Sequence, residues 1–282
     1  MLVDYHFHLH RDSVGPVTYQ APDIIECAER AKAKGIEELA VTEHINRFIE
    51  AKHLFSPLEG KADSRVWQWL QETPTGWLTD YVQAVQGAKE AGLPVKLGIE
   101  VDYFPQAEKL IKDLLADYPW DYVLGSVHFL DGFAVDYSKD SGWPEQDVNQ
   151  VYEDYTELVI AAAHCGLFDA IAHVDLVKKF GARPDSDLGL VLARRCAEEF
   201  QRAGVAVEVN AAGLRKPVKE IYPSLPMLFL CKQREVPIVL GSDGHGIDEV
   251  GLLVSKARTW ALQAGYTEVC TFTQRQPALK PL

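Results

Sequence analysis

The sequence is poor in the features that mark several large protein classes. Its 282 residues contain only five cysteines, which are scattered and form no C-x-x-C pair. We therefore expect reduced thiols, as in a cytoplasmic protein, and no disulfide framework. No apolar run approaches the roughly 18 residues of a membrane span. The chain also opens without the basic and apolar segments of a secretion signal, so we expect a soluble, cytoplasmic protein.

Basic residues are scarce relative to acidic ones. The chain has 28 Lys and Arg against 41 Asp and Glu, a net charge of −13. Non-specific binding to polymeric nucleic acid needs a basic surface that displaces counterions. We therefore expect no nucleic acid and no membrane partner, whereas a local basic pocket for a small anion stays open, as does a homo-oligomer.

What the sequence does contain is an alternation of apolar strands and helices. We expect strands over residues 4–8, 36–42, 95–101, 121–127, 170–172, 205–209, 237–240 and 269–272. We expect helices over residues 22–34, 78–91, 106–115, 145–165, 186–203, 225–234 and 248–264. Strands that are apolar on both faces are typical of a parallel sheet covered by helices. About seven such units without a linker predict one α/β barrel domain over residues 1–282.

One segment, at about 45–75, interrupts this alternation. A loop of this length either covers an active site or is a helical surface excursion. Both interpretations are open from the sequence.

Side chains of the kinds that bind metals stand at the ends of nearly all predicted strands. The first strand ends in His6 and His8, which point the same way because side chains alternate along a strand. The later strand ends carry His44, Glu100, His128, His173, Asn210, Asp243 and His245. The carboxyl ends of barrel strands share one rim, so we expect these side chains to converge. Imidazole and carboxylate together favour Zn, Mn or Fe, and a carboxylate can bridge two ions.

Some of these residues have plainer interpretations. His128 and His173 could be core histidines that bond to backbone groups. Asn210 could orient a ligand or satisfy the backbone. Glu43 points away from the face of His44 and is expected in a structural salt bridge.

Two basic loops follow strands and therefore lie above the same rim. Residues 176–183 contain Lys178, and residues 213–217 contain Arg215. Arginine offers paired donors and lysine a point charge, so the loops predict a pocket for an anion such as phosphate. The alternative is ordinary solvated loop charge.

Taken together, the motifs resemble the PHP (polymerase and histidinol phosphatase) superfamily. They are H-F-H at 6–8, T-E-H at 42–44, G-I-E-V-D at 98–102, G-S-V-H at 125–128, A-H-V-D at 172–175 and G-S-D-G-H at 241–245. Residues 175–181, 210–217 and 220–223 are similar to the PHP-type histidinol-phosphate phosphatases within it.

The resemblance implies a distorted (β/α)7 TIM-like barrel with two to three divalent ions. His6, His8, Glu100 and Asp243 would hold the first ion, Glu100, His128 and His173 the second, and His44 with His245 the third. Many relatives carry a further histidine after the H-x-H pair, where this chain has Val14 and Gly15. Asp12 is the nearest substitute and His10 the next.

The implied reaction is hydrolysis of L-histidinol phosphate to L-histidinol and phosphate. Glu100, Asp243 and His245 would be catalytic. Arg215 and Lys178 would bind the phosphate. Asp102 and the 45–75 segment would bind the amino and imidazole groups. Two alternatives stay open: a PHP phosphoesterase for another small phosphorylated metabolite or nucleotide, and a non-enzymatic metal-binding or regulatory protein.

Overall fold

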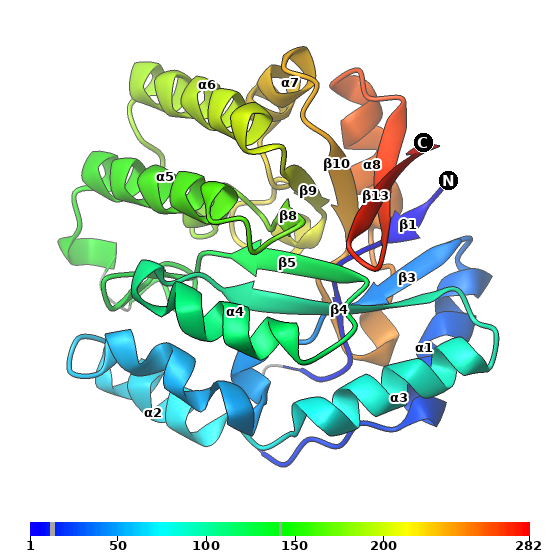
Figure 1. The fold of residues 1–282 in the computed structure, drawn as a ribbon. Helices are drawn as coiled ribbons and strands as arrows, with labels where there is room; N and C mark the ends of the chain where they lie inside the picture. Colours follow the sequence, from blue (N-terminus) through cyan, green and yellow to red (C-terminus); the bar gives the residue numbers. More distant parts are fainter. Residues whose placement is uncertain (12–14, 141–142) are drawn as a thin grey trace.

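A computed structural model describes residues 1–11, 15–140 and 143–282. At its centre lies a parallel sheet whose strands follow the chain order. They are β1 (Val3–Asp4), β3 (Glu38–Val41), β4 (Val95–Asp102), β5 (Tyr122–Ser126), β8 (Ala170–Ile171), β9 (Ala206–Asn210) and β10 (Ile238–Gly241). The Tyr5 amide donates to the Leu240 carbonyl at 2.7 Å and joins the two outer strands. The sheet is therefore a nearly closed barrel (Figure 1), and the predicted α/β barrel of seven strands is confirmed.

Helices surround this sheet, and α5 packs on α6 as α6 packs on α7 (Figure 1). The α-helices are α1 (Ala21–Ala33), α2 (Ser64–Glu72), α3 (Leu78–Glu90), α4 (Glu108–Ala116), α5 (Val148–His164), α6 (Ser186–Ala203), α7 (Leu225–Gln233) and α8 (Val254–Gln263). Helix α6 has its predicted bounds and ends at Gly204 in the left-handed conformation, φ +69°. In the described part of the chain, no helix is both long and apolar enough to span a membrane.

Helix α8 begins six residues later than the predicted 248. The preceding residues instead form a short 3-10 turn, η7 (Ile247–Glu249). The Gly251 amide donates at 3.0 Å to the buried carboxylate of Asp4, and Leu253 is left-handed with φ +65°. These contacts hold the chain away from a helical path until Val254.

Shorter strands flank the barrel. At the rim, β2 (Phe7–His8) pairs in parallel with β11 (Gly244–His245). Two antiparallel hairpins were not predicted as such: β6 (Phe129–Leu130) with β7 (Phe133–Ala134), and β12 (Glu268–Thr273) with β13 (Gln276–Pro281). Every residue of β13 is exposed, so it lacks the apolar alternation on which a strand prediction depends.

The 45–75 segment forms η1 (Ile45–Arg47), η2 (Ile49–Leu58) and α2. Phe48, Phe55 and Leu70 from it are buried in the hydrophobic core. Asn46 and Trp69 line a cavity together with His44 and His128 at the rim. The segment therefore supplies part of the wall of a cavity at the rim. That it covers an active site stays a prediction. That residues 1–282 form one domain stays a prediction.

Candidate metal centre

The barrel brings the predicted strand-end residues together. The parallel ladders set their registers: β2 and β11 place His8 beside His245, and an isolated bridge places His44 beside Glu100. His128 and His173 follow β5 and β8, and Asp243 follows β10. Six histidines and two carboxylates thus meet at one rim, as the common direction of the strands predicted.

Glu100 lies at the centre of this cluster and is 1% exposed. Its Oε2 lies 2.6 Å from His44 Nδ1 and 3.4 Å from His6 Nε2, and its Oε1 lies 3.2 Å from His173 Nε2. Burial by itself would raise the pKa of Glu100, but His44, His6 and His173 hold it well below its usual range. The residue is therefore an ionised carboxylate surrounded by imidazoles.

The donors fall into overlapping groups. Among the described residues, the following sets each have three ligand atoms within 4.8 Å of one another: His6, His8 and Glu100; His6, His173 and Asp243; Glu100, His128 and His173; His8, His44 and His245. The third set is the one that the resemblance implied. The fourth adds His8 to the implied pair of His44 and His245.

Buried carboxylates outside the cluster orient two of its histidines. His6 Nδ1 lies 2.7 Å from Glu208 Oε1, and His128 Nδ1 lies 2.7 Å from Asp102 Oδ1. In each ring the other nitrogen, Nε2, is left to point toward Glu100. A carboxylate behind a histidine is the usual support of a metal-binding imidazole. Asp102, which we predicted to contact substrate, lies in this supporting position.

Glu208 was missed by the sequence analysis. It lies inside β9, and its Oε2 also accepts the His173 amide at 2.8 Å and Asn210 Nδ2 at 3.0 Å. Asn210 Nδ2 in turn lies 3.2 Å from Asp243 Oδ2, so Asn210 orients a member of the cluster. The available signal was a carboxylate in the middle of a strand, with an apolar residue on each side of it (Val207 and Val209).

The donor geometry fits divalent cations. His6 Nε2 and His8 Nε2 are 3.0 Å apart, and His44 Nε2 and His245 Nε2 are 3.2 Å apart. Two nitrogens bound to one tetrahedral zinc are about 3.3 Å apart, given bonds of about 2.0–2.1 Å. Glu100 Oε2 is buried, and its near neighbours are imidazole nitrogens, with His44 Nδ1 at 2.6 Å and His6 Nε2 at 3.4 Å. A cation would satisfy this oxygen and the ring nitrogens at once.

The charge states also favour cation binding. Burial would lower the pKa of His6, but Glu208, Asp243 and Glu100 raise it well above its ordinary value. Burial and the neighbouring His44 and His245 hold the pKa of His8 well below its ordinary value, so His8 is neutral. Burial would likewise lower the pKa of His128, but Asp102 raises it to about 10. The same carboxylates that attract protons here would attract a metal ion in their place.

Two members of the cluster have strained backbones. His173 has φ +24° and Asp243 has φ +50°, values that residues with a side chain rarely adopt. Such strain concentrates where side-chain placement matters for function. At Gly241, the last residue of β10, a Cβ would lie 2.0 Å from Glu208 Oε1. Position 241 therefore needs glycine for Glu208 to reach His6.

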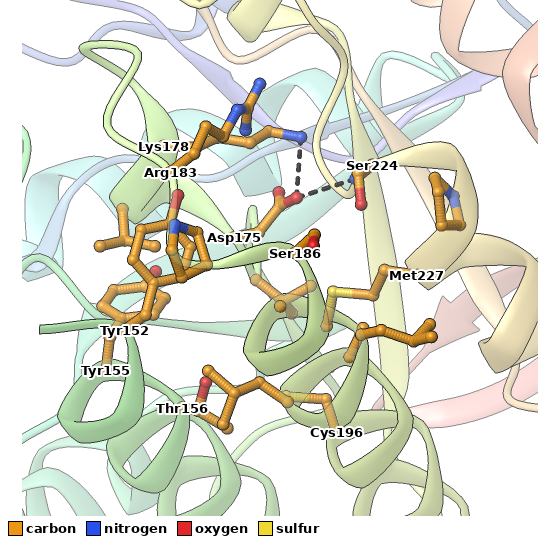
Figure 2. A pocket seen from close by; sticks show the side chains of 18 of the residues that line it. Tyr152, Tyr155, Thr156, Asp175, Lys178, Arg183, Ser186, Cys196, Ser224 and Met227 are labelled. Atoms are coloured by element: carbon orange, nitrogen blue, oxygen red, sulfur yellow. Dashed lines mark hydrogen bonds and ion pairs between the residues drawn. The ribbon is translucent and has the colours of Figure 1, made fainter. Parts of the chain in front are cut away.

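The two residues predicted to bind phosphate lie in different places: Arg215 lies beside the cluster, whereas Lys178 faces a separate cavity. Arg215 donates to the carbonyls of Ser242 at 3.1 Å and Asp243 at 2.8 Å, and so supports the backbone that carries Asp243. The Lys178 side chain is 1% exposed and pairs with Asp175 at 2.7 Å. It lines a separate cavity of about 480 Å³ beside α5 and α6, where the pair is marked by a dashed line (Figure 2).

Other lysines line the small cavity directly over the rim. Lys179 and Lys216 do so beside His44, His128, His173, Asp243 and His245. Lys179 Nζ pairs with Asp136 at 3.0 Å. Within the described part of the chain, no hydrogen bond or ion pair occupies the Lys216 ammonium.

Of the two residues predicted to complete the third ion site, Asp12 and His10, the structure describes only His10. Asp12 lies outside the described residues. His10 Nε2 bonds to the Thr18 carbonyl at 3.0 Å, and its ring packs on Tyr19.

Glu43 accepts hydrogen bonds from the backbone amides of Leu9 and His10.

Comparison with known families agrees with this geometry. The PHP domain model matches residues 6–212, which include all but two of the cluster's donors. The chain belongs to the PHP domain family. Among curated relatives, one from Deinococcus radiodurans, named "Probable histidinol-phosphatase", is 36% identical over 252 residues, or 89% of each chain. The histidinol-phosphatase of Bacillus subtilis is 29% identical over 249 residues, covering 79% of this chain and 87% of the relative.

A solved structure supports the PHP fold. The histidinol phosphate phosphatase of Lactococcus lactis, determined with Zn, L-histidinol and phosphate, superposes with a TM-score of 0.73. The alignment covers 98% of each chain at 22% sequence identity. At this identity the likeness shows that the two chains share the (β/α)7 barrel.

Proposed function

We propose that this protein is a metal-dependent phosphate monoesterase that hydrolyses L-histidinol phosphate to L-histidinol and phosphate. One observation carries the proposal: six histidines and two carboxylates converge at the rim of a PHP barrel. The names of the Deinococcus and Bacillus relatives support the substrate, as do the L-histidinol and phosphate bound to the Lactococcus protein.

Two to three divalent ions of Zn, Mn or Fe would be held by His6, His8, His44, Glu100, His128, His173, Asp243 and His245. Imidazole and carboxylate donors suit these ions, and zinc is present in the Lactococcus structure. When bound, such ions acidify water and offset negative charge on phosphoryl oxygens. Glu100, Asp243 and His245 are proposed as catalytic through this role.

The chain's own residues would place the phosphate. Lys216 offers a positive charge with no competing partner among the described residues in the cavity over the rim, and Lys179 stands beside it. Fixed cations at this point offset charge as it shifts among the phosphoryl oxygens. Arg215 would act indirectly, because its guanidinium holds the Ser242 and Asp243 carbonyls. We also propose a cytoplasmic location, in agreement with five free cysteines.

The test is steady-state phosphate release after reconstitution with Zn, Mn or Fe(II). L-histidinol phosphate should exceed AMP and glucose 6-phosphate in kcat/KM by about 100-fold or more, since buried polar contacts discriminate strongly. Equal, low rates on all three esters would reject the substrate. No release from any ester, with the ions bound, would reject the monoesterase.

A further inference from the structure

The cavity beside α5 and α6 is separate from the one over the rim. Its volume is about 480 Å³, which lies within the range of small-molecule sites. The chain that follows β8 divides the two cavities, because Val177 and Lys178 line this one whereas Leu176 and Lys179 line the one over the rim. The proposed reaction takes place at the rim and leaves this cavity without a role.

Apolar side chains form much of the cavity wall. They come from the chain after β8 and from α6 and α7, and they include Val177, Leu190, Leu192, Ala193 and Met227. Figure 2 shows Lys178 and Arg183 at one end of the cavity and Cys196 at the opposite end. A matching ligand therefore has charged groups at one end and an apolar body at the other.

The ammonium of Lys178 already has its full set of partners. Its Nζ lies 2.7 Å from Asp175 Oδ2 and 3.5 Å from Glu220 Oε2, and it donates to the Ile221 carbonyl at 2.9 Å. These three acceptors match the three donors of an ammonium. Lys178 therefore has no donor left for a ligand, although its side chain lines the cavity.

Asp175, by contrast, has one oxygen that is not used. Its Oδ2 accepts from Lys178 and from the Ser224 amide, the latter at 2.8 Å. Its Oδ1 is buried and has no hydrogen-bond partner among the described residues. An unpaired buried oxygen is costly, so a donor from a ligand is expected there. A protonated amine makes the stronger, charge-assisted kind of hydrogen bond to a carboxylate.

Arg183 supplies a positive charge at the exposed edge of the cavity. Its side chain is 47% exposed, and its Nη2 donates to Glu220 Oε2 at 2.5 Å. A guanidinium has five N–H donors in a planar fork, so it can bind a second carboxylate at the same time. The charged side chains of the lining are two acids and two bases: Asp175, Glu220, Lys178 and Arg183. Their charges cancel, so the cavity favours a ligand without net charge that carries both an anionic and a cationic group.

We propose that this cavity binds a zwitterionic amino acid with an apolar or aromatic side chain. The ammonium of the ligand donates to Asp175 Oδ1, and its carboxylate accepts from Arg183. Its side chain packs against Leu192 and Met227. The inference goes beyond the proposed function and does not depend on it, because the site is separate from the metal centre.

Calorimetric titration of the metal-loaded protein with L-phenylalanine and L-leucine tests the class of ligand. We expect one molecule to bind per chain. Phenethylamine lacks the carboxylate, N-acetyl-L-phenylalanine lacks the ammonium and glycine lacks the apolar body. Each should bind at least about 10-fold more weakly than L-phenylalanine, since each loses a charged contact or the apolar contacts. No binding of either amino acid would overturn the site, and equal affinity for phenethylamine or N-acetyl-L-phenylalanine would overturn the zwitterion.

Two variants with matched controls locate the bound amino acid. Ala193→Phe fills the cavity and should abolish binding, whereas Val191→Phe adds the same ring to a position of α6 that is 60% exposed and outside the cavity. Arg183→Gln should weaken the binding of L-phenylalanine by about 10-fold or more. Its control is Arg195→Gln, because Arg195 is also 47% exposed and paired with a glutamate but does not line the cavity.

Circular dichroism would establish that the variants are folded, and Arg183→Gln changes an exposed side chain, so the test does not depend on Ala193→Phe alone. Loss of binding in the cavity variants with wild-type affinity in both controls is the expected result. Wild-type affinity in Arg183→Gln and in a folded Ala193→Phe would mean that the amino acid binds elsewhere, such as at the rim, and would overturn the inference.

Discussion

Replacing Glu100 by glutamine is expected to lower kcat/KM for phosphate release by about 1,000-fold and to reduce the number of bound ions. Glu100 contacts His44, His6 and His173 and belongs to two of the four donor groups. The amide removes the negative charge and leaves one oxygen where two stood. Loss of charge stabilisation worth several kcal/mol corresponds to a change of roughly this size. Metal analysis and steady-state kinetics measure the two effects.

Arg215→Ala is the comparison variant. Its guanidinium bonds to the Ser242 and Asp243 carbonyls, so its loss should disturb Asp243 and leave most of the metal content in place. Circular dichroism would establish that both variants are folded. Full metal content and full turnover in Glu100→Gln would disprove the role assigned to Glu100.

Removal of the metal ions by a chelator is expected to abolish phosphate release, by about 1,000-fold or more, and to lower the thermal midpoint. The donors are largely buried and close-packed, with ring nitrogens 3.0 Å apart in His6 and His8. An ion bound only by the folded state stabilises it, so its removal destabilises the protein. Zinc, manganese or ferrous iron should restore both properties, since imidazole ligands favour these ions over magnesium.

Phosphate release and unfolding curves would be recorded before dialysis, after it and after reconstitution, with dialysis lacking chelator as the control. Full turnover at less than about 0.1 ion per chain would contradict the metal-dependent reaction. A failure of every tested ion to restore activity to a folded protein would do the same.

The rim could be predicted from sequence because each strand carries its own evidence. Parallel strands end at one edge of the barrel. A residue such as His6, Glu100 or His173 can therefore be assigned to the rim simply because it follows an apolar run. No knowledge of the strand order was required. The (β/α) alternation gave most helix bounds for the same local reason, whereas α8 was shifted by contacts to Asp4 that are far away in sequence.

The support behind the rim could not be predicted in this way. Glu208 lies within β9. Its carboxylate reaches the His6 imidazole only because the folded barrel packs β9 close to His6 and Gly241, which are distant from it in sequence. Lys178 and Lys179 are neighbours at the end of one 3-10 turn, yet Lys179 lines the cavity over the rim and Lys178 a different cavity. The two residues are of the same type and adjacent in sequence, so nothing in the sequence distinguishes them. The geometry of the turn alone makes their side chains point into different cavities.

The cavity walls from the 45–75 segment were beyond sequence reasoning too. Much of the segment is 3-10 helix, so its sequence lacks the apolar periodicity of an α-helix from which the buried face could be predicted. Its placement follows from the burial of Phe48, Phe55 and Leu70. That packing brings Asn46 and Trp69 to the rim.

Anomalous diffraction from crystals of the zinc-loaded protein tests the central claim most directly, because it locates the ions without relying on activity. We expect two or three peaks at the rim, each at about 2.0–2.2 Å from nitrogen or carboxylate atoms of the clustered residues, with Glu100 touching at least one. Fully loaded crystals that show no peak near Glu100, His6 or His173 would contradict the metal centre.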